Sequence, residues 1–204
     1  MVERLINEVN IALENRLYLV ALNTALTLPD ICGRAKYPNT KTSDRYKMWY
    51  KEYIGQYEQG GNVTDKMPYL NEEVVYQLRC ALLHQGNPNI GKEKTGIDCF
   101  ELVIEAPQNG FGIYVDSSCI SEHPDNTTVY SYRVSIHGLC FKLCSTALAY
   151  YKNNKEQFNF FDYTIIDMEK ELVKMQPYLK CIEEYEIEET IRKMKEDGKN
   201  YRGG

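Results

Sequence analysis

The stretch LRCALLHQG, residues Leu78–Gly86, is the part of the sequence that decides the fold. It is short and mostly apolar, which is typical of a helix packed in a core. Gly86 and the proline that follows two residues later predict the end of that helix. Arg79 and His84 lie inside the apolar run, and His84 is one of only three histidines in the chain. The stretch therefore predicts a core helix that carries a candidate site.

The helix around this stretch is expected over residues 70–85. Asn71 is the expected cap, and Glu72 and Glu73 complement the positive end of the helix dipole. Upstream, apolar residues three and four positions apart predict one long helix over residues 2–26, with Pro29-Asp30 as its stop signal.

A further helix is expected over residues 43–57, with Ser43 as its cap. An aromatic stripe follows its period, at Tyr46, Trp49, Tyr50, Tyr53 and Tyr57. Two interpretations fit this stripe. Most such stripes are core, whereas aromatics interleaved with basic residues can also stack on nucleic-acid bases.

The periodicity changes to that of strands between residues 98 and 136. Strands are expected at 100–106, 112–115 and 128–136, and Pro107-Gln108-Asn109-Gly110 is typical of a hairpin turn. Helical spacing returns over 138–152. After Asp162 two helices are expected, broken near Pro177.

The predicted fold class is α+β, in a single domain over residues 1–204. A helical bundle is expected from residues 1–90 and 138–200, with a small antiparallel sheet inserted at about 98–136.

Composition narrows the function classes. The 204 residues carry a net charge of −5 and have a pI near 5.4, which argues against a basic surface for non-specific nucleic-acid binding. Seven cysteines without a CxxC pair favour reduced thiols and a cytoplasmic location. The N-terminus lacks the layout of a signal peptide, and the longest apolar run is too short to span a bilayer, so no membrane association is expected.

Familiar catalytic and binding motifs are missing from the sequence. It has no phosphate-binding glycine loop, nucleophile elbow, HExxH zinc motif or EF-hand loop. Cys140 and Cys144 have the four-residue spacing of two metal ligands on a helix, but buried thiols are favoured because no second pair lies nearby. His137, at a strand-to-helix junction, fits a cap or a packed ring as well as a catalytic role. No metal and no cofactor are expected.

Asp30 and Arg34 flank the turn after the first helix, and two interpretations remain open for them. They can form a local ion pair or stabilise the turn. Alternatively they can form the polar walls of a pocket, which would make them candidate substrate-binding residues.

Arg79, four intervening residues and His84, in the setting Leu-Arg-x-x-Leu-x-His-x-Gly, resemble the signature helix of the HEPN superfamily. That resemblance implies a helical bundle, commonly dimeric, of a superfamily in which many members are metal-independent ribonucleases of toxin and antiviral systems. It also implies that Arg79 and His84 are the catalytic pair, brought together with the partner subunit's copy. Cys80 follows the arginine, where active members often carry a polar residue such as asparagine.

Helix geometry places a condition on this pair. Five positions along a straight α-helix advance by about 7.5 Å and rotate by about 140°, so Arg79 and His84 do not share a face. They can converge through the length of the arginine or through relaxation of the last turn near Gly86. Alternatively, a second copy of the chain, related by two-fold symmetry, can complete the pair. A purely structural arrangement has Arg79 bonded to a carboxylate such as Asp30 and His84 bonded to the last carbonyls of its helix.

The leading functional prediction is a HEPN-like cytoplasmic protein of a prokaryotic stress or defence system. It would be a metal-independent ribonuclease that acts on RNA as a homodimer, with an antitoxin or regulatory protein as a further partner. The alternative is a non-catalytic HEPN-like binding or regulatory module. A third hypothesis is a small-molecule enzyme that uses His137 in a pocket between sheet and bundle.

Overall fold

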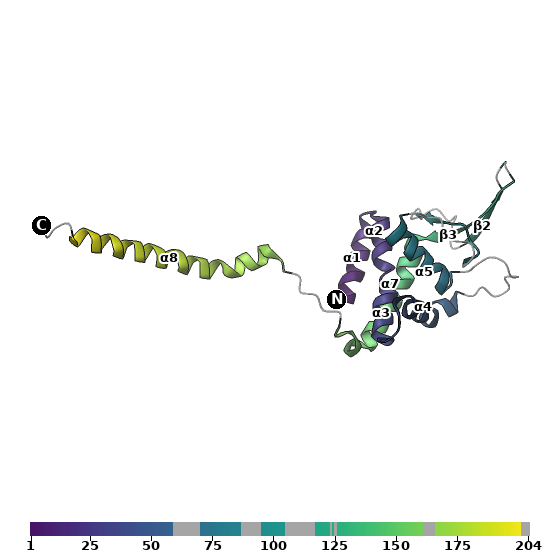
Figure 1. Ribbon diagram of the computed structural model, residues 1–204, viewed down its shortest axis with the longest axis horizontal. Helices are drawn as coiled ribbons and strands as arrows, with labels where there is room; N and C mark the ends of the chain where they lie inside the picture. Colours follow the sequence, from purple (N-terminus) through teal and green to yellow (C-terminus); the bar gives the residue numbers. More distant parts are fainter. Residues whose placement is uncertain are drawn as a thin grey trace. The chain divides into compact units, whose positions relative to one another are not determined.

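The chain consists of two compact units, Met1–Asp162 and Tyr163–Gly204. The computed structural model describes residues 1–58, 70–86, 95–104, 117–122, 124, 126–160 and 166–200. The first unit is α+β, mostly helical with a small mixed sheet (Figure 1). The expected strand 112–115 and the hairpin turn 107–110 lie outside the described residues.

The N-terminal segment forms two helices, α1 (Val2–Glu14) and α2 (Tyr18–Ala25), which pack on each other. The prediction of one helix over 2–26 is therefore wrong. Arg16 adopts a left-handed backbone conformation, with φ of 58°. Its N–H donates to Leu13 O at 3.0 Å, and the N–H of Leu17 donates to Ala12 O at 2.8 Å. This pattern closes a helix end in the way a glycine usually does, but it is built on an arginine.

Helix α3 (Leu28–Lys36) begins where the sequence predicted a stop. Pro29 lies in its first turn, where the missing N–H removes no helical hydrogen bond. Helix α4 (Thr42–Tyr53) follows, and a short 3₁₀ turn, η1, covers Gly55–Tyr57. The expected Ser43 cap is also wrong, because α4 starts one residue earlier and its cap position is Lys41.

The aromatic stripe of α4 lies mainly in the core. Tyr46, Trp49 and Tyr50 are fully buried, so the core interpretation is confirmed for them. Trp49 stacks on Tyr53, and both rings meet the ring of Tyr150 edge-on. These contacts join α4 to a helix almost a hundred residues later in the chain and anchor the α3–α4 pair in the bundle.

The helix of the opening stretch is α5 (Glu72–Cys80), continued by a π-helical turn, η2 (Ala81–Gln85). Its start is confirmed, because the side chain of Asn71 accepts hydrogen bonds from the N–H groups of Glu73 and Val74. Its end is confirmed as well. Gly86 takes a left-handed conformation with φ of 59°, which favours glycine.

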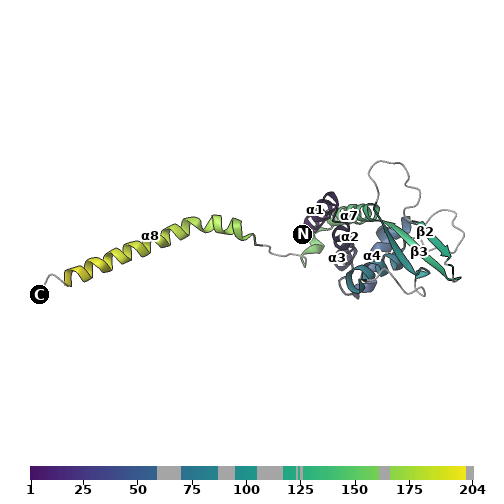
Figure 2. The ribbon, with the colours of Figure 1, turned by 90° about the horizontal axis from the view of Figure 1, so that it is seen from above.

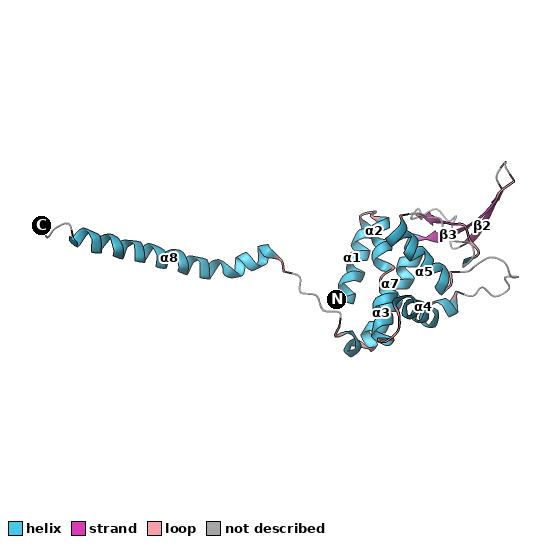
Figure 3. Ribbon diagram, viewed as in Figure 1, coloured by secondary structure: helices cyan, strands magenta, loops and turns pink. Residues whose placement is uncertain are grey.

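The sheet has the strand order β1-β3-β2, from β1 (Cys99–Val103), β2 (Ser117–Glu122) and β3 (Thr128–Ser135). The strand β2 pairs antiparallel with β3. It lies between the strands expected at 112–115 and 128–136, in residues that were expected to form a loop, so that expectation is wrong. However, β1 pairs parallel with β3, so the prediction of a purely antiparallel sheet is wrong. Parallel pairing needs a long connection, and the residues between β1 and β3, which include β2, supply it. Figure 3 shows the strands gathered on one side of the first unit.

Helix α7 (Ile136–Asn153) follows β3 directly and is the centre of the bundle. It packs against α1, α2 and α3 (Figure 2). The side chain of Ser135 caps it by accepting the N–H of Gly138 at 2.9 Å. The expected helix over 138–152 is confirmed and starts two residues earlier. A short 3₁₀ turn, η3 (Lys155–Phe158), adds the Phe158 ring to the Trp49 cluster through Tyr150.

The described part of the second unit consists mainly of one helix, α8 (Met168–Asn200). The predicted break near Pro177 is wrong, because the helix continues through it. A proline interrupts one hydrogen bond and adds a steric clash, which a long helix can absorb as a bend. Within the described residues, no helix is both long and apolar enough to cross a membrane.

Helices α3 and α4 approach closely at Gly33, which has a testable consequence. A Cβ at this position would lie 2.6 Å from the backbone carbonyl oxygen of Arg45. Alanine normally stabilises a helix interior by about 1 kcal/mol relative to glycine. Here we expect Gly33→Ala to lower the free energy of unfolding by about 1–3 kcal/mol, measured by denaturant titration, because the two backbones must separate.

Gly55→Ala is the matched control. Its Cβ would meet the ring of Tyr50 at 3.4 Å, an ordinary contact. Its free energy of unfolding should change by less than about 1 kcal/mol. A Gly33→Ala variant as stable as the wild type would show that this close approach does not constrain the α3–α4 pair.

Candidate functional site

Arg79 and His84 lie where the regular helix α5 passes into the π-helical turn η2. Hydrogen bonds in such a turn run from residue i to residue i+5, so side chains five positions apart share a face. Nη1 of Arg79 lies 3.4 Å from Nε2 of His84. The condition set by helix geometry is thus met within one chain, through relaxation of the last turn before Gly86.

The contact also constrains the imidazole. A guanidinium group can only donate hydrogen bonds. In this arrangement Nε2 of His84 therefore accepts, which places the ring proton on Nδ1. The ring is exposed to solvent. The electron pair of Nε2 is thus engaged by the fixed positive charge of Arg79, on an imidazole at the surface of the protein.

Arg79 is held on several sides and is only 13% exposed. Its Nη2 lies 4.0 Å from Oδ2 of Asp30 in α3. Its guanidinium carbon lies 5.6 Å from the ring centre of Tyr46 and 6.0 Å from that of Tyr76. Two aromatic faces and one carboxylate therefore fix the guanidinium, and the fork of donors cannot swing freely.

Asp30 is shared between two arginines. Arg45 Nε donates to Asp30 Oδ1 at 2.8 Å, whereas the Arg79 contact to Oδ2 is longer. We call Asp30, Arg45, Tyr46, Tyr76 and Arg79 the Arg79 cluster. Its two guanidinium groups share one carboxylate, so the cluster carries an excess of positive charge. That charge, next to an exposed imidazole, suits an anionic ligand such as a phosphate.

The two tyrosines of the cluster remain neutral phenols. Burial strongly raises the pKa of Tyr46, and burial likewise raises the pKa of Tyr76. Tyr46 is fully buried and meets the ring of Tyr76 edge-on. Within the described residues, neither the Tyr46 hydroxyl nor Arg79 Nε has a hydrogen-bond partner. The cluster thus keeps a buried donor of Arg79 unsatisfied.

The chain matches no protein-family model, no curated protein and no solved structure in comparisons with known proteins.

The structure separates the two other predicted site residues. Asp30 joins the Arg79 cluster. Arg34 lies one turn further along α3, and its guanidinium carbon is 4.7 Å from the ring centre of Phe160. Among the described residues, Asp30 forms its ion pairs with Arg45 and Arg79 and not with Arg34. The local ion pair considered from the sequence is therefore wrong.

Arg45, Tyr46 and Tyr76 belong to the cluster but were not predicted as site residues. Tyr46 carried a signal, since it belongs to the aromatic stripe, but neither interpretation of that stripe, core or stacking on bases, placed it beside Arg79. Arg45 lies 15 positions after Asp30, and nothing local links the two. The close packing of α3 on α4 at Gly33 brings them together.

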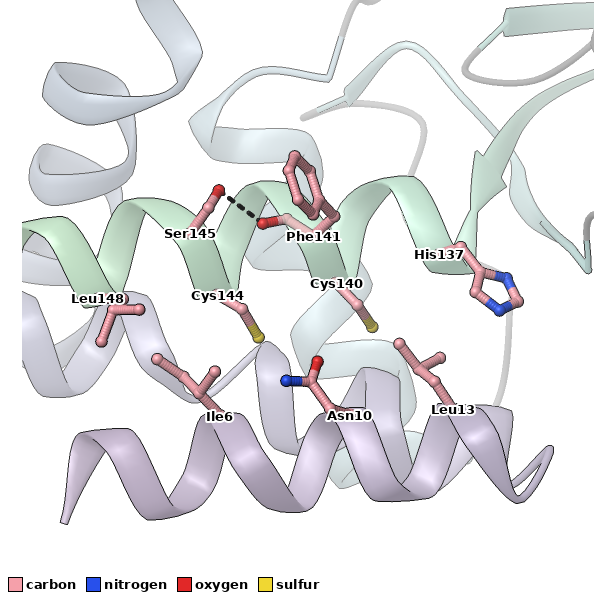
Figure 4. Close-up of a pocket in the computed structure, with 9 residues that line it drawn as sticks. All are labelled: Ile6, Asn10, Leu13, His137, Cys140, Phe141, Cys144, Ser145 and Leu148. Carbon is pink, nitrogen blue, oxygen red and sulfur yellow. Dashed lines mark hydrogen bonds between the residues drawn. The ribbon is translucent and has the colours of Figure 1, made fainter.

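A second feature is a cavity of about 430 Å³ between α1 and α7, shown in Figure 4. Cys140 and Cys144 point toward α1 there, and His137 lies at one end. The cavity lies between two helices, not between sheet and bundle as the third hypothesis expected.

The chemistry of this cavity is that of a core. Cys140 and Cys144 are buried, which confirms the interpretation as buried thiols. Burial raises the pKa of Cys140 to about 12 and that of Cys144 to about 11, so both thiols are protonated near neutral pH. His137 packs edge-on against Tyr18. The described residues contain no group of three or more side chains suited to hold a metal ion.

Proposed function

We propose that this protein is a HEPN-like, metal-independent ribonuclease of a prokaryotic stress or defence system and acts as a homodimer. The observation that supports the proposal is the 3.4 Å approach of Arg79 to His84 across a π-helical turn. Turns of this kind are rare, carry a cost in hydrogen-bond geometry and occur often at functional sites. Here the turn aligns the two residues that the HEPN resemblance nominates.

The roles follow from the chemistry of the two groups. When a bound phosphate accepts the hydrogen bond of Arg79 in place of Nε2, His84 takes the proton of a 2′-hydroxyl as general base, and the 2′-oxygen attacks the adjacent phosphorus. The bond from phosphorus to the 5′-oxygen breaks, and that oxygen needs a proton. Arg79 holds the phosphate and offsets the charge that builds up on its oxygens. The products are a 2′,3′-cyclic phosphate and a 5′-hydroxyl.

One imidazole cannot act as base and acid in the same step. Among the residues that the structure describes, His84 is the single histidine in this site, since His137 lies on α7 beside Tyr18. A homodimer removes the difficulty, because one copy of His84 acts as base while the other protonates the leaving oxygen. The proposal therefore includes a two-fold arrangement that brings two exposed copies of His84 together.

The test is RNA cleavage by the full chain in the presence of a chelator. We expect cleavage to persist with EDTA and to yield 2′,3′-cyclic phosphate and 5′-hydroxyl ends. The 5′ ends should accept a labelled phosphate directly, whereas the 3′ ends should resist ligation until the cyclic phosphate is opened and removed. The double variant Arg79→Ala/His84→Ala is expected to be inactive. Equal activity of the double variant, or cleavage that requires a divalent metal, would contradict the proposal.

A second candidate is a non-catalytic HEPN-like module that binds RNA or a protein partner such as an antitoxin. The contact between Arg79 and Asp30 favours it, because a guanidinium occupied by a carboxylate is less available to a phosphate. Cys80, beside Arg79, favours it as well. Under this alternative the full chain binds RNA or its partner without cleaving, and Arg79→Ala weakens that binding.

A further inference from the structure

Helix α8 carries an exposed apolar stripe with the spacing of a coiled-coil seam. Its members alternate four and three positions apart, and we call them the seam: Met168, Leu172, Met175, Leu179 and Ile182. Each is between 41% and 65% exposed. In an α-helix this spacing places all of them within about 40° of one line. A contiguous exposed stripe of this kind marks a surface that another helix covers.

Pro177 leaves the seam intact. It lies nine positions after Met168, which puts it about 180° from the seam on the helix. The hydrogen bond that a proline omits is therefore on the opposite face. The ring clash opens the helix on its own side and bends the helix toward the seam side. The proline is thus placed where it does not interrupt a partner on the seam.

The charges around the seam are segregated. Glu169, Glu171 and Glu183 flank it, at about 60–100° from its centre line. The lysines of the same segment lie further round, at about 120° or more, at Lys170, Lys174 and Lys180. Lys174 reaches back to Glu171 at 2.7 Å, whereas the described residues provide no ion pair to Glu169 or Glu183. The rim of the seam is therefore acidic.

The negative charge continues along the helix beyond the seam. Residues 183–189 contain five glutamates and no basic residue. A second copy of α8 laid on the seam in parallel register would bring these glutamates close to one another, and like charges at flanking positions destabilise a coiled coil. An anionic membrane surface would be repelled for the same reason. A helix whose apolar stripe is flanked by lysine and arginine has the complementary pattern.

We propose that α8 is a docking helix for a partner protein segment that is amphipathic, helical and basic along the edges of its apolar stripe. The seam supplies the buried contact. The glutamates select a positively charged partner and determine how that partner is aligned along α8. The proposal stands apart from the Arg79–His84 site and holds whether or not that site cleaves RNA.

The test uses the full chain and two synthetic helical peptides of about three heptads each. Both carry leucine at the core positions, and one carries lysine and the other glutamate at the flanking positions. Binding is measured by fluorescence anisotropy. We expect the basic peptide to bind at least about tenfold more tightly than the acidic one, with an affinity that falls as salt rises.

Matched variants separate the seam from the rest of the helix. Leu172→Asp or Leu179→Asp should abolish binding of the basic peptide. Val173→Asp, at an exposed apolar residue off the seam, should leave it unchanged. Glu183→Lys on the rim should weaken binding by about tenfold, whereas Glu184→Lys, on the far face, should have little effect. Circular dichroism of each variant reports whether α8 remains helical.

Three outcomes would overturn the proposal: no binding of the basic peptide, equal binding of both peptides, or equal losses in the seam and control variants. Sedimentation of the wild type tests whether a second copy of this chain, rather than a different partner, covers the seam. Dimers that Leu172→Asp dissolves, together with no peptide binding, would assign the seam to a second copy. RNA cleavage by the seam variants is measured in parallel, so that failure of this proposal is distinguishable from failure of the ribonuclease.

Discussion

His84→Ala is expected to reduce metal-free RNA cleavage by about 10²–10⁴-fold, the usual contribution of general acid–base catalysis. The loss should appear in kcat, because in the proposed mechanism the imidazole moves a proton and Arg79 remains to hold the phosphate. The side chain is exposed, and 3.4 Å separates it from Arg79. Its removal should therefore change the free energy of unfolding by no more than about 0.5 kcal/mol.

His137→Ala is the matched histidine control. His137 lies on α7 against Tyr18, away from the Arg79 cluster. Its replacement can cost stability through the lost ring contact, so activity is compared per folded molecule. We expect cleavage by this variant at the wild-type rate. A loss as large as that of His84→Ala would mean that neither histidine acts through the proposed chemistry.

Arg79→Ala is expected to reduce cleavage by about 10²–10³-fold, because the developing charge on the phosphate loses its donor. Unlike His84→Ala, it should also weaken RNA binding and lower the stability by about 1–2 kcal/mol, since Arg79 packs on two aromatic rings and approaches Asp30. The measurements are kcat, the RNA dissociation constant and denaturant unfolding on the same preparation.

Arg79→Lys separates charge from shape. Lysine keeps the positive charge but not the planar fork that reaches His84 and Asp30 together. We expect it to recover stability and part of the RNA affinity while kcat stays low. Arg4→Ala, at an exposed arginine that pairs with Glu8 on α1, is the control and should behave as wild type. Full activity in Arg79→Lys would reduce the role of Arg79 to a charge.

Local signals predicted the elements that depend on local chemistry. Asn71 could be identified as a cap and Gly86 as a terminator because each satisfies backbone groups within its own turn. The break at Arg16 was missed, since an arginine rarely takes a positive φ and no glycine marks the position. Pro29 was interpreted as the end of one helix, whereas it lies in the first turn of the next, α3. Proline is compatible with both positions.

The candidate site was predicted in part. Arg79 and His84 could be nominated from their place in an apolar helix, but the π-helical turn that aligns them has no sequence signature that the chain displays. The link between Asp30 and Arg45 depends on two helices packing at a glycine, and a sequence pattern does not report such tertiary distances. The parallel pairing of β1 and β3 was missed for the same reason.

The junction at Ser135 determines how the sheet is built into the protein. Segments added to a bundle are commonly joined through loops at both ends and can be removed or exchanged. Here β3 ends at the residue that caps α7, so the strand and the central helix are continuous. Removing the sheet would strip the cap from the helix on which α1, α2 and α3 pack. We therefore expect the amides of β3 and α7 to open together in hydrogen exchange, as one cooperative unit, and the sheet to be an inseparable part of the bundle.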